Sequence, residues 1–178
     1  MKSLTPKQIA FIERQPMFFV ATAAAEGRVN VSPKGMDTLR VLDEQRIVWL
    51  NLSGSGNETA AHVLANGRMT LMFMSIDDAP LILRVYGTAR VIHPRDDDWH
   101  DAIADFPTLG GSRQLFDLTI ETVSSSCGSG VPVMTVDRIR GDEELKPFYA
   151  EMSPEELEDF WRRKNVTSID GYPTEIFG

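Results

Sequence analysis

Apolar and polar residues alternate over short runs along most of the chain, and this spacing predicts strands in preference to helices. The runs are rich in β-branched and aromatic side chains, and the stretches between them carry Gly, Asp, Asn or Pro. Such connections suit antiparallel hairpins and not helical crossovers, so an antiparallel sheet of about six or seven strands is expected. The strand-like runs are residues 17–24, 28–32, 37–42, 46–52, 68–75, 80–92, 115–123 and 131–136.

Helical spacing is confined to the ends of the chain and to the connections between strands. Thr5 and Gln8 match a capping box with proline at the first helical position, and the helix that they open is expected to end before Pro16. Ser153 and Glu156 match a second capping box. Together the pattern predicts a mainly β (α+β) fold, an antiparallel barrel with peripheral helices. Two more expected helices cover residues 60–66 and 93–106.

The segment NLSGSGNETAAH, residues 51–62, joins a strand to a helix through a tight loop. Ser55 and Glu58 match a capping box, and a cap alone implies no ligand. However, Gly54 and Gly56 leave the backbone beside Ser55 bare. Unpaired N–H groups at the positive end of a helix dipole form a seat for phosphate. The loop is therefore a candidate phosphate site.

Three further residues strengthen the phosphate reading of this loop. Thr59 adds a hydroxyl to the first helical turn. Lys34 and Arg40 lie just upstream and supply positive charge if their strands pair with residues 46–52, the alternative being solvated surface cations. No Gly-Lys-Ser/Thr follows the glycines, which excludes a Walker loop. A dinucleotide-binding βαβ unit is the weaker alternative, because the third glycine of that motif is missing.

Composition limits the classes of function. The chain has 178 residues, a hydrophobic fraction of 42%, a formal net charge of −8 and one cysteine. This length suits one domain, and the acidic balance argues against nucleic acid and anionic membranes as partners. No signal peptide or long apolar run is present, so a cytoplasmic protein is expected. The three histidines and Cys127 have no metal-ligand spacing, so no metal is expected.

Residues 28–92 resemble the pyridoxamine 5'-phosphate oxidase family, whose members are FMN-binding split β-barrels. The resemblance lies in the hairpin SPKGMDTLRVLDEQRIVWLNL, the polar loop with its short helix ending Ala-Asn-Gly, the strand RMTLMFM and the segment LILRVYGTARV. The later segments SSSCGSGVPV and KNVTSIDGYP are similar to a subgroup of that superfamily. The resemblance implies one domain over residues 1–178, with a barrel core in 1–140 and a C-terminal helical extension in 141–178.

The resemblance also implies a cofactor site. Arg40 matches a basic residue that grips the FMN phosphate, but Asn57, Glu58 and Thr59 stand where the family's loop has further phosphate ligands, including cations. Binding would then depend on backbone N–H groups, hydroxyls and Arg40. The expected cofactor-binding residues are Lys34, Thr38, Arg40, Leu50, Asn51, Ser55, Gly56, Asn57, Thr59 and Arg84.

The implied function is an FMN-dependent oxidoreductase acting on a small molecule, in a homodimer with sites across the interface. NAD(P)H is the candidate electron donor, and no catalytic residue is assigned. Pyridoxamine phosphate is not the favoured substrate, since the tail GYPTEIFG lacks the family's arginine and histidine pair. The alternative is a non-catalytic flavin- or haem-binding protein. Cys127 is a candidate to complete the partner's site, although a small buried hydrophobe is the favoured reading.

Overall fold

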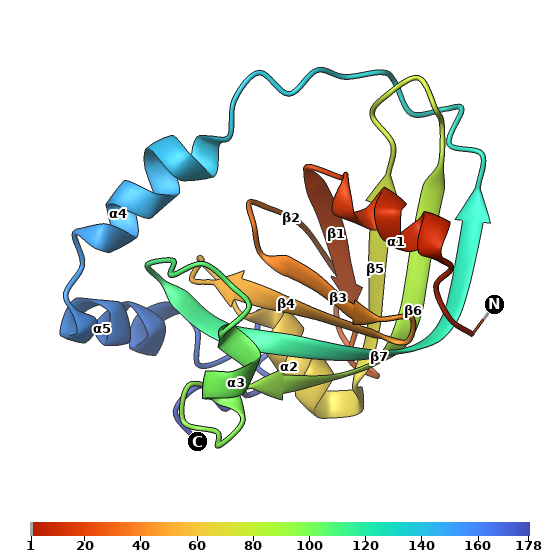
Figure 1. The fold of residues 1–178 in the computed structure, drawn as a ribbon. Helices are drawn as coiled ribbons and strands as arrows, with labels where there is room; N and C mark the ends of the chain where they lie inside the picture. The colour runs from red at the N-terminus through yellow and green to blue at the C-terminus, as the bar shows by residue number, and fades with distance from the viewer. Residues whose placement is uncertain (1) are drawn as a thin grey trace.

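A single antiparallel sheet of seven strands, strongly curled, forms the centre of the molecule (Figure 1). The computed structural model describes residues 2–178. The strand order is β2-β1-β5-β6-β7-β4-β3, so β2 and β3 are the two edges. The arrangement confirms the expected split barrel with helices around it. The strands are β1 (Met17–Thr22), β2 (Asn30–Gly35), β3 (Leu39–Asp43), β4 (Arg46–Leu52), β5 (Arg68–Met74), β6 (Ile82–Ile92) and β7 (Ser112–Ser126).

The helices lie outside the sheet, and a long extended segment connects the last strand to the last helices (Figure 1). This segment, residues 127–140, is called the strap below. Figure 1 shows the strap arching away from the sheet before it enters the C-terminal helices. The helices are α1 (Pro6–Glu13), α2 (Glu58–Asn66), α3 (Trp99–Ile103), the π-helix η1 (Gly141–Leu145), α4 (Lys146–Ala150) and α5 (Pro154–Lys164).

The core fills the inside of the curled sheet with large apolar side chains. The Trp49 and Phe116 rings stack with centroids 4.6 Å apart, and Phe18 meets Trp49 edge-on at 6.1 Å. Each such side chain contributes about 1.5 to 3 kcal/mol by burial. A second cluster, which includes Leu50 and Trp99, packs on the other face of β4 and β7. The strands that carry the site are therefore fixed from both faces.

Local sequence signals set several element ends. Thr5 and Ser153 form the capping boxes that the sequence predicts. Gly67 ends α2 in the left-handed conformation with φ of 72°, which glycine adopts without strain. Gly87 lies where β6 comes so close to the Thr119 backbone that a β-carbon would clash.

Two expected elements and the weaker alternative for the central unit are wrong. Residues 131–136 form no strand, because they belong to the strap and have no neighbouring strand to pair with. The helix expected over 93–106 is limited to the five residues of α3, since a turn precedes it and Pro107 follows. The βαβ alternative fails because β4 and β5 are not neighbours in the sheet.

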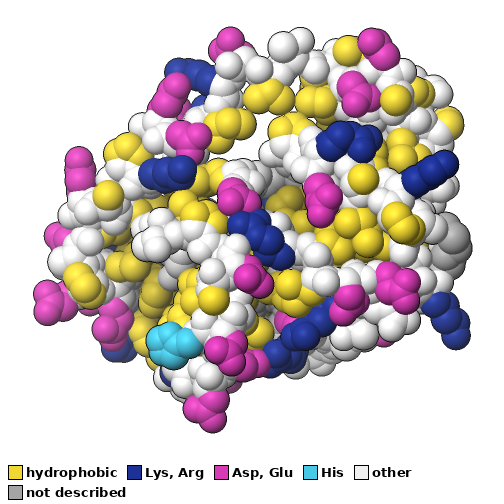
Figure 2. All heavy atoms as spheres, in the orientation of Figure 1, with side chains coloured by type: hydrophobic (Ala, Val, Ile, Leu, Met, Phe, Trp, Pro, Cys, Tyr) yellow, Lys and Arg dark blue, Asp and Glu magenta, His cyan; other side chains and the backbone are white. Residues whose placement is uncertain are grey.

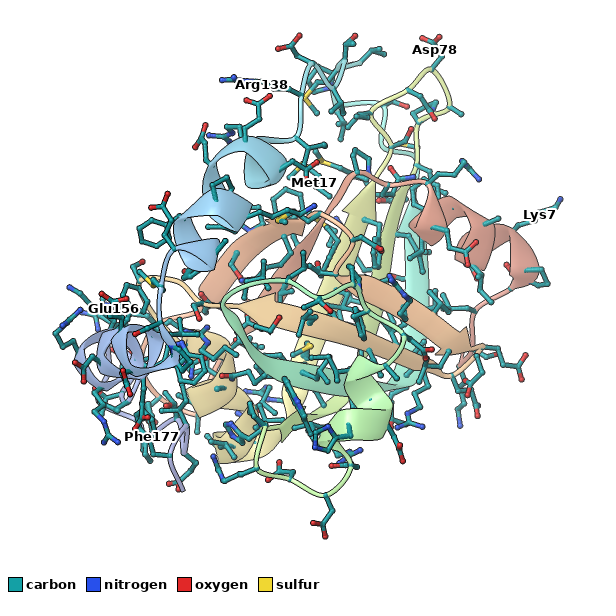
Figure 3. All side chains as sticks on the ribbon, turned by 60° about the vertical axis from the view of Figure 1, so that its left-hand side comes forward. Lys7, Met17, Asp78, Arg138, Glu156 and Phe177 are labelled. Atoms are coloured by element: carbon teal, nitrogen blue, oxygen red, sulfur yellow. The ribbon has the colours of Figure 1, made fainter. Side chains whose placement is uncertain are left out.

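Two further findings concern the surface. Across residues 2–178, none of the helices has the length and apolar character that a membrane span requires. Figure 2 shows the face beneath the strap hollowed, with hydrophobic side chains around the opening. Figure 3 turns this side forward, with Met17 at the start of β1 and Arg138 on the strap.

Candidate functional site

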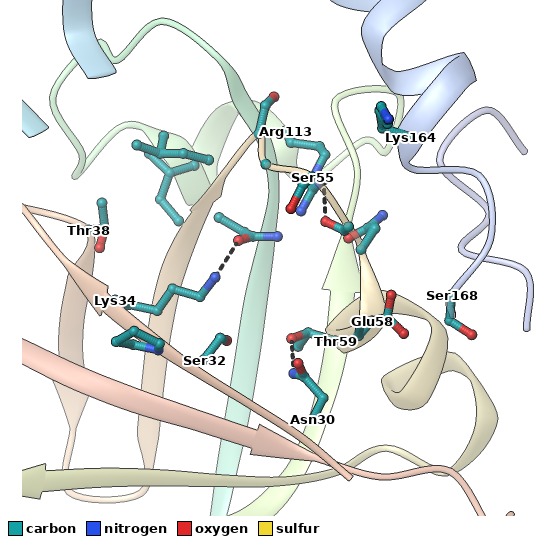
Figure 4. A pocket seen from close by; sticks show the side chains of 18 of the residues that line it. Asn30, Ser32, Lys34, Thr38, Ser55, Glu58, Thr59, Arg113, Lys164 and Ser168 are labelled. Atoms are coloured by element: carbon teal, nitrogen blue, oxygen red, sulfur yellow. Dashed lines mark hydrogen bonds between the residues drawn. The ribbon is translucent and has the colours of Figure 1, made fainter. Parts of the chain in front are cut away.

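A cleft of about 740 Å³ lies between β2, the end of β4, the loop before α2 and the C-terminal segment (Figure 4). The glycine-rich loop, residues 53–57, forms one wall. Residues 167–169 contribute to another wall, after the chain has left α5. The cleft thus collects residues from the first third, the middle and the end of the chain.

Arg113, at the start of β7, is the most deeply buried cation of the cleft. Its side chain is 3% exposed, and Nη1 donates a hydrogen bond to the Gly56 carbonyl at 3.0 Å. The buried Nε has no hydrogen-bond partner. Burial lowers the pKa of Arg113 from its ordinary value to about 10. A charge that is buried with an unsatisfied donor indicates a missing anionic partner.

Lys34, on β2, is the second desolvated cation. Its Nζ lies 3.4 Å from Asn51 Oδ1 and 5.4 Å from the centroid of the Trp49 ring. Burial, and after it the charge of Arg113, lowers the pKa of Lys34 from 10.5 to about 8. Two desolvated cations therefore share one cleft, and the charge of Arg113 disfavours the charge of Lys34.

The charge balance of the cleft is opposite to that of the whole chain. Its lining has three cations, Lys34, Arg113 and Lys164, against one carboxylate, Glu58. The Glu58 carboxylate already accepts the Ile169 N–H at 3.0 and 3.1 Å. Although the chain carries a formal charge of −8, this cleft attracts anions.

The start of α2 differs from the sequence prediction. The helix begins at Glu58 with Asn57 as N-cap, and Asn57 makes no side-chain cap bond. The capping box over Ser55 and Glu58 is therefore wrong: Ser55 is exposed, and Glu58 is held by the C-terminal segment. Instead, the side-chain amides of Asn57 and of Gln114 in β7 form two hydrogen bonds with each other, at 3.1 and 3.3 Å. The first N–H groups of α2 are thus left without a side-chain cap.

The C-terminal segment closes this end of the cleft through Asn165, which is fully buried. Asn165 Nδ2 donates to the Gly54 carbonyl at 2.9 Å, and the Asn165 carbonyl accepts the Asn57 amide at 3.4 Å. Trp161 Nε1 donates to the Ser53 hydroxyl at 2.7 Å. These bonds fix both sides of the glycine-rich loop.

Hydroxyl and amide groups line the remaining wall. Asn30 Nδ2 donates to the Thr59 hydroxyl at 3.3 Å, and the buried Ser32 hydroxyl has no partner. Thr38 donates its hydroxyl to the Gly35 carbonyl at 2.8 Å. Beside two cations, these groups suit a ligand that combines an anionic end with a polar, planar body.

The structure brings eight of the ten predicted cofactor-binding residues to this cleft. They are Lys34, Thr38, Leu50, Asn51, Ser55, Gly56, Asn57 and Thr59. The other two lie elsewhere in the described chain. The Arg40 guanidinium binds Asp37 and the Asp105 carbonyl and lies over the Phe106 ring. Arg84 donates to the Ser126 hydroxyl at 3.2 Å.

Sequence reasoning missed Arg113, Lys164 and the other residues of the C-terminal wall. Arg113 lies 57 residues after Gly56, and only the pairing of β4 with β7 brings the two together. The segment KNVTSIDGYP was singled out by resemblance, but no residue in it was assigned a role. Cys127 is exposed beyond the end of β7, so the favoured reading as a buried hydrophobe is wrong.

Comparisons with known proteins agree with the fold. The family model described as pyridoxamine 5'-phosphate oxidase matches residues 4–127. The pyridoxamine 5'-phosphate oxidase family protein ustO of Aspergillus flavus is 34% identical, covering 90% of this chain and 71% of its own.

Solved structures share the fold at lower identity. A putative pyridoxamine 5'-phosphate oxidase from Lactobacillus delbrueckii has a TM-score of 0.58 at 24% identity, over 70% of this chain and 95% of its own. HutZ, the haem storage protein of Vibrio cholerae, has a TM-score of 0.50 at 19% identity, over 70% and 94%. The matched residues and the identity to ustO place this chain in the pyridoxamine 5'-phosphate oxidase family.

Proposed function

We propose that the protein binds FMN in this cleft and is an FMN-dependent oxidoreductase acting on a small molecule. The observation that carries the proposal is the pair of desolvated cations, Arg113 and Lys34, which no carboxylate among residues 2–178 neutralises. They lie in one cleft with the uncapped start of α2. A phosphate monoester would satisfy the free Arg113 Nε, pair with the Arg113 charge and accept backbone N–H groups, and Lys34 would lie beside another part of the same anionic ligand.

The residues of the cleft would divide the work of holding the cofactor. The loop residues 54–57, Arg113 and Lys164 would bind the phosphate, and Thr59 would add its hydroxyl. Leu50 and Asn51, at the end of β4, would lie along the flavin, as the family resemblance implies. Because each of these residues is fixed by sheet pairing or by the C-terminal wall, the seat is formed before the ligand arrives.

When bound, FMN itself supplies electron transfer, so the protein needs no dedicated acid or base. The chain's own contribution is to hold the phosphate, orient the ring system and keep Lys34 at the cleft as a proton-bearing group of lowered pKa. NAD(P)H is proposed as the electron donor, and a second copy of the chain as the other half of the functional unit. The roles of Arg40 and Arg84 stay predictions.

Haem binding is the second candidate, because HutZ shares the fold. Haem iron is held in proteins by His, Cys, Met or Tyr side chains. Within the part of the chain that the structure describes, the cleft lining includes Met36 but no His or Cys. Of the buried histidines, His62 contacts the Thr22 hydroxyl and lies outside the cleft. Because the described lining offers no iron ligand of these types except Met36, it favours a phosphorylated flavin over haem.

The direct experiment is mass spectrometry of the small molecule that the native protein releases on denaturation. FMN, with flavin absorption bands before release, supports the proposal. Haem, or a protein that neither contains flavin nor takes it up, contradicts it. Anaerobic bleaching of the bound flavin by NAD(P)H then separates an enzyme from a flavin store. FMN occupancy of Arg40→Ala and of Ser55→Ala tests the predictions that these two residues bind the cofactor.

A further inference from the structure

A second cavity, of about 790 Å³, lies beneath the strap and differs in chemistry from the cofactor cleft. We call it the chamber. Its walls are the start of β1, the end of β2, the strap, η1 and α4. The apolar side chains that line it include Met17, Met36, Ile76, Met134, Ile139 and Phe148. Figure 2 shows its opening as a hollow rimmed by hydrophobic side chains.

The chamber and the cofactor cleft share a wall. Residues 33–36 and Leu145 line both cavities. Lys34 therefore stands at the junction, with its Nζ directed to Asn51 on the cofactor side. A molecule in the chamber would lie next to whatever occupies the Leu50 end of the cleft. This continuity is what a substrate site requires of a flavin protein.

Met36, in the shared wall, has a strained backbone. Its φ is 63°, a left-handed conformation that residues other than glycine rarely adopt. The side chain is packed against Gly141 of η1, where there is no room for a β-carbon. Strain of this kind persists where the surroundings impose it, and it is concentrated at ligand sites. Met36 is thus held as part of the partition between the two cavities.

Apolar side chains of the strap are exposed to solvent around the chamber. Met134 is 41% exposed, Ile139 38% and Phe148, on α4, 49%. Leaving this surface in water is unfavourable, and an apolar ligand would cover it. Three methionines, Met17, Met36 and Met134, line the space with flexible thioethers that adapt to different shapes.

The chamber lacks the features of a phosphate seat. Its two strap arginines are exposed: Arg138 is paired with Glu143 at 2.8 Å, and Arg140 shares the lining with Glu144. Among the residues described, its lining has no cation as deeply buried as Arg113, and the π-helix that opens onto it has only five residues. The cofactor cleft has a buried arginine without a counterion, whereas the chamber has exposed arginines and a mostly apolar lining, so the two cavities favour different chemical groups.

We propose that the chamber binds the apolar part of the substrate, an aromatic or branched aliphatic compound that carries no phosphate, with Met36 and Lys34 between it and the flavin. Calling the ligand a substrate rests on the proposed function. The binding of an apolar molecule in the chamber can be tested independently of it. The occupant is a small molecule, because the chamber continues into the cofactor cleft.

The test titrates the full-length protein, with its bound flavin, with N-phenyl-1-naphthylamine, a neutral aromatic dye that fluoresces in apolar surroundings. Ile139→Asp places a charge in the chamber at a half-exposed position that the fold tolerates. We expect the dye affinity to fall about tenfold, because the charge must be desolvated. Val29→Asp, at an apolar position 71% exposed and outside both cavities, is the matched control. It should leave dye affinity unchanged, and FMN occupancy should be unchanged in both variants.

Three results would overturn the proposal. The first is equal dye affinity in Ile139→Asp and wild type. The second is displacement of the dye by pyridoxamine 5'-phosphate, which would mean that a phosphorylated ligand fits. The third is loss of dye binding together with dissociation of a dimer, which would mean that a second copy covers the strap. A protein without flavin that still binds the dye in the chamber would contradict the proposed function alone.

Discussion

Two charged groups four residues apart on β7 have opposite surroundings. Asp117 is 6% exposed and accepts hydrogen bonds from Arg46 at 2.7 and 2.8 Å and from Arg90 at 3.1 Å. Arg113 is 3% exposed and binds one carbonyl, with no carboxylate beside it. The first group is complete within the chain. The second has a charge that the chain does not neutralise.

This difference separates a charge that is paired within the fold, Asp117, from a charge that is left to pair with a ligand, Arg113. Burial raises the pKa of Asp117, but hydrogen bonds and the charges of its two arginines outweigh it, so the net shift is downward. For Arg113 and Lys34, burial lowers the pKa and no carboxylate compensates. An uncompensated buried charge is costly, and it is retained where it serves binding.

The largest expected effect is that of Arg113→Met, which removes the buried charge at similar length. FMN affinity should fall by about 2 to 3 kcal/mol, roughly 30- to 150-fold, because charge-assisted bonds to phosphate are lost. The free energy of unfolding of the cofactor-free variant should rise by about 1 kcal/mol, since an unpaired buried charge is gone. Flavin fluorescence titration and urea unfolding measure the two. A fall in stability without a fall in affinity would make Arg113 structural.

Asp117→Asn should give the reverse result. Unfolding free energy should fall by about 2 kcal/mol, since Arg46 loses its counterion and Arg90 keeps only Asp98, whereas FMN affinity should not change. The lowered pKa of Asp117 gives stability that is present above its ordinary value of 3.8 and lost as pH falls. Acid unfolding followed by circular dichroism should therefore lose part of its pH dependence in the variant. Reduced FMN affinity would show that the two groups are coupled.

Lys34 should make FMN binding depend on pH. Because its pKa is about 8 in the folded protein, the positive charge that Lys34 places beside the anionic cofactor is lost as pH rises through 8, and affinity should fall by up to about tenfold. Cofactor-free stability should rise between pH 8 and 10.5, where the unfolded chain binds the extra proton. Lys34→Arg keeps its charge and should flatten the affinity profile. A profile unchanged by this substitution would assign the titration to another group.

The smallest effect is expected for Lys164, which is exposed at the end of α5. Lys164→Ala should weaken FMN binding about two- to threefold at low salt and less at high salt, because an exposed charge is screened. Arg163→Ala, next in sequence but outside the cleft lining, is the control. Equal effects of the two variants would mean that Lys164 acts only through the overall charge of the protein and makes no specific contact with FMN.

The sequence predicts the strands well because their alternation is local. Residues 46–52, for example, form β4 with the predicted bounds. It fails where the partner is distant in the chain. Glu58 matches a capping box locally, but the Ile169 N–H, 111 residues away, binds its carboxylate instead. In the sequence alone, Arg113 looks like an ordinary cation on a strand. Its place beside the loop depends on the pairing of β7 with β4.

The predicted cofactor-binding residues include much of the cleft lining but only one of its three cations, Lys34. The family resemblance identified the loop and β4, and it assigned the phosphate contact to Arg40, which the structure places against Asp37 and Phe106. The other two cations of the cleft, Arg113 and Lys164, come from the start of β7 and the end of α5. Which cations face the loop is a property of tertiary packing and not of spacing.

The most direct test compares FMN with riboflavin, which has the same ring system without phosphate, in the wild-type protein and in Arg113→Met. The account predicts that the wild type binds FMN about a hundredfold more tightly than riboflavin and that most of this preference disappears in the variant. Equal affinity of the wild type for the two flavins, or a preference for FMN that Arg113→Met leaves intact, would contradict it.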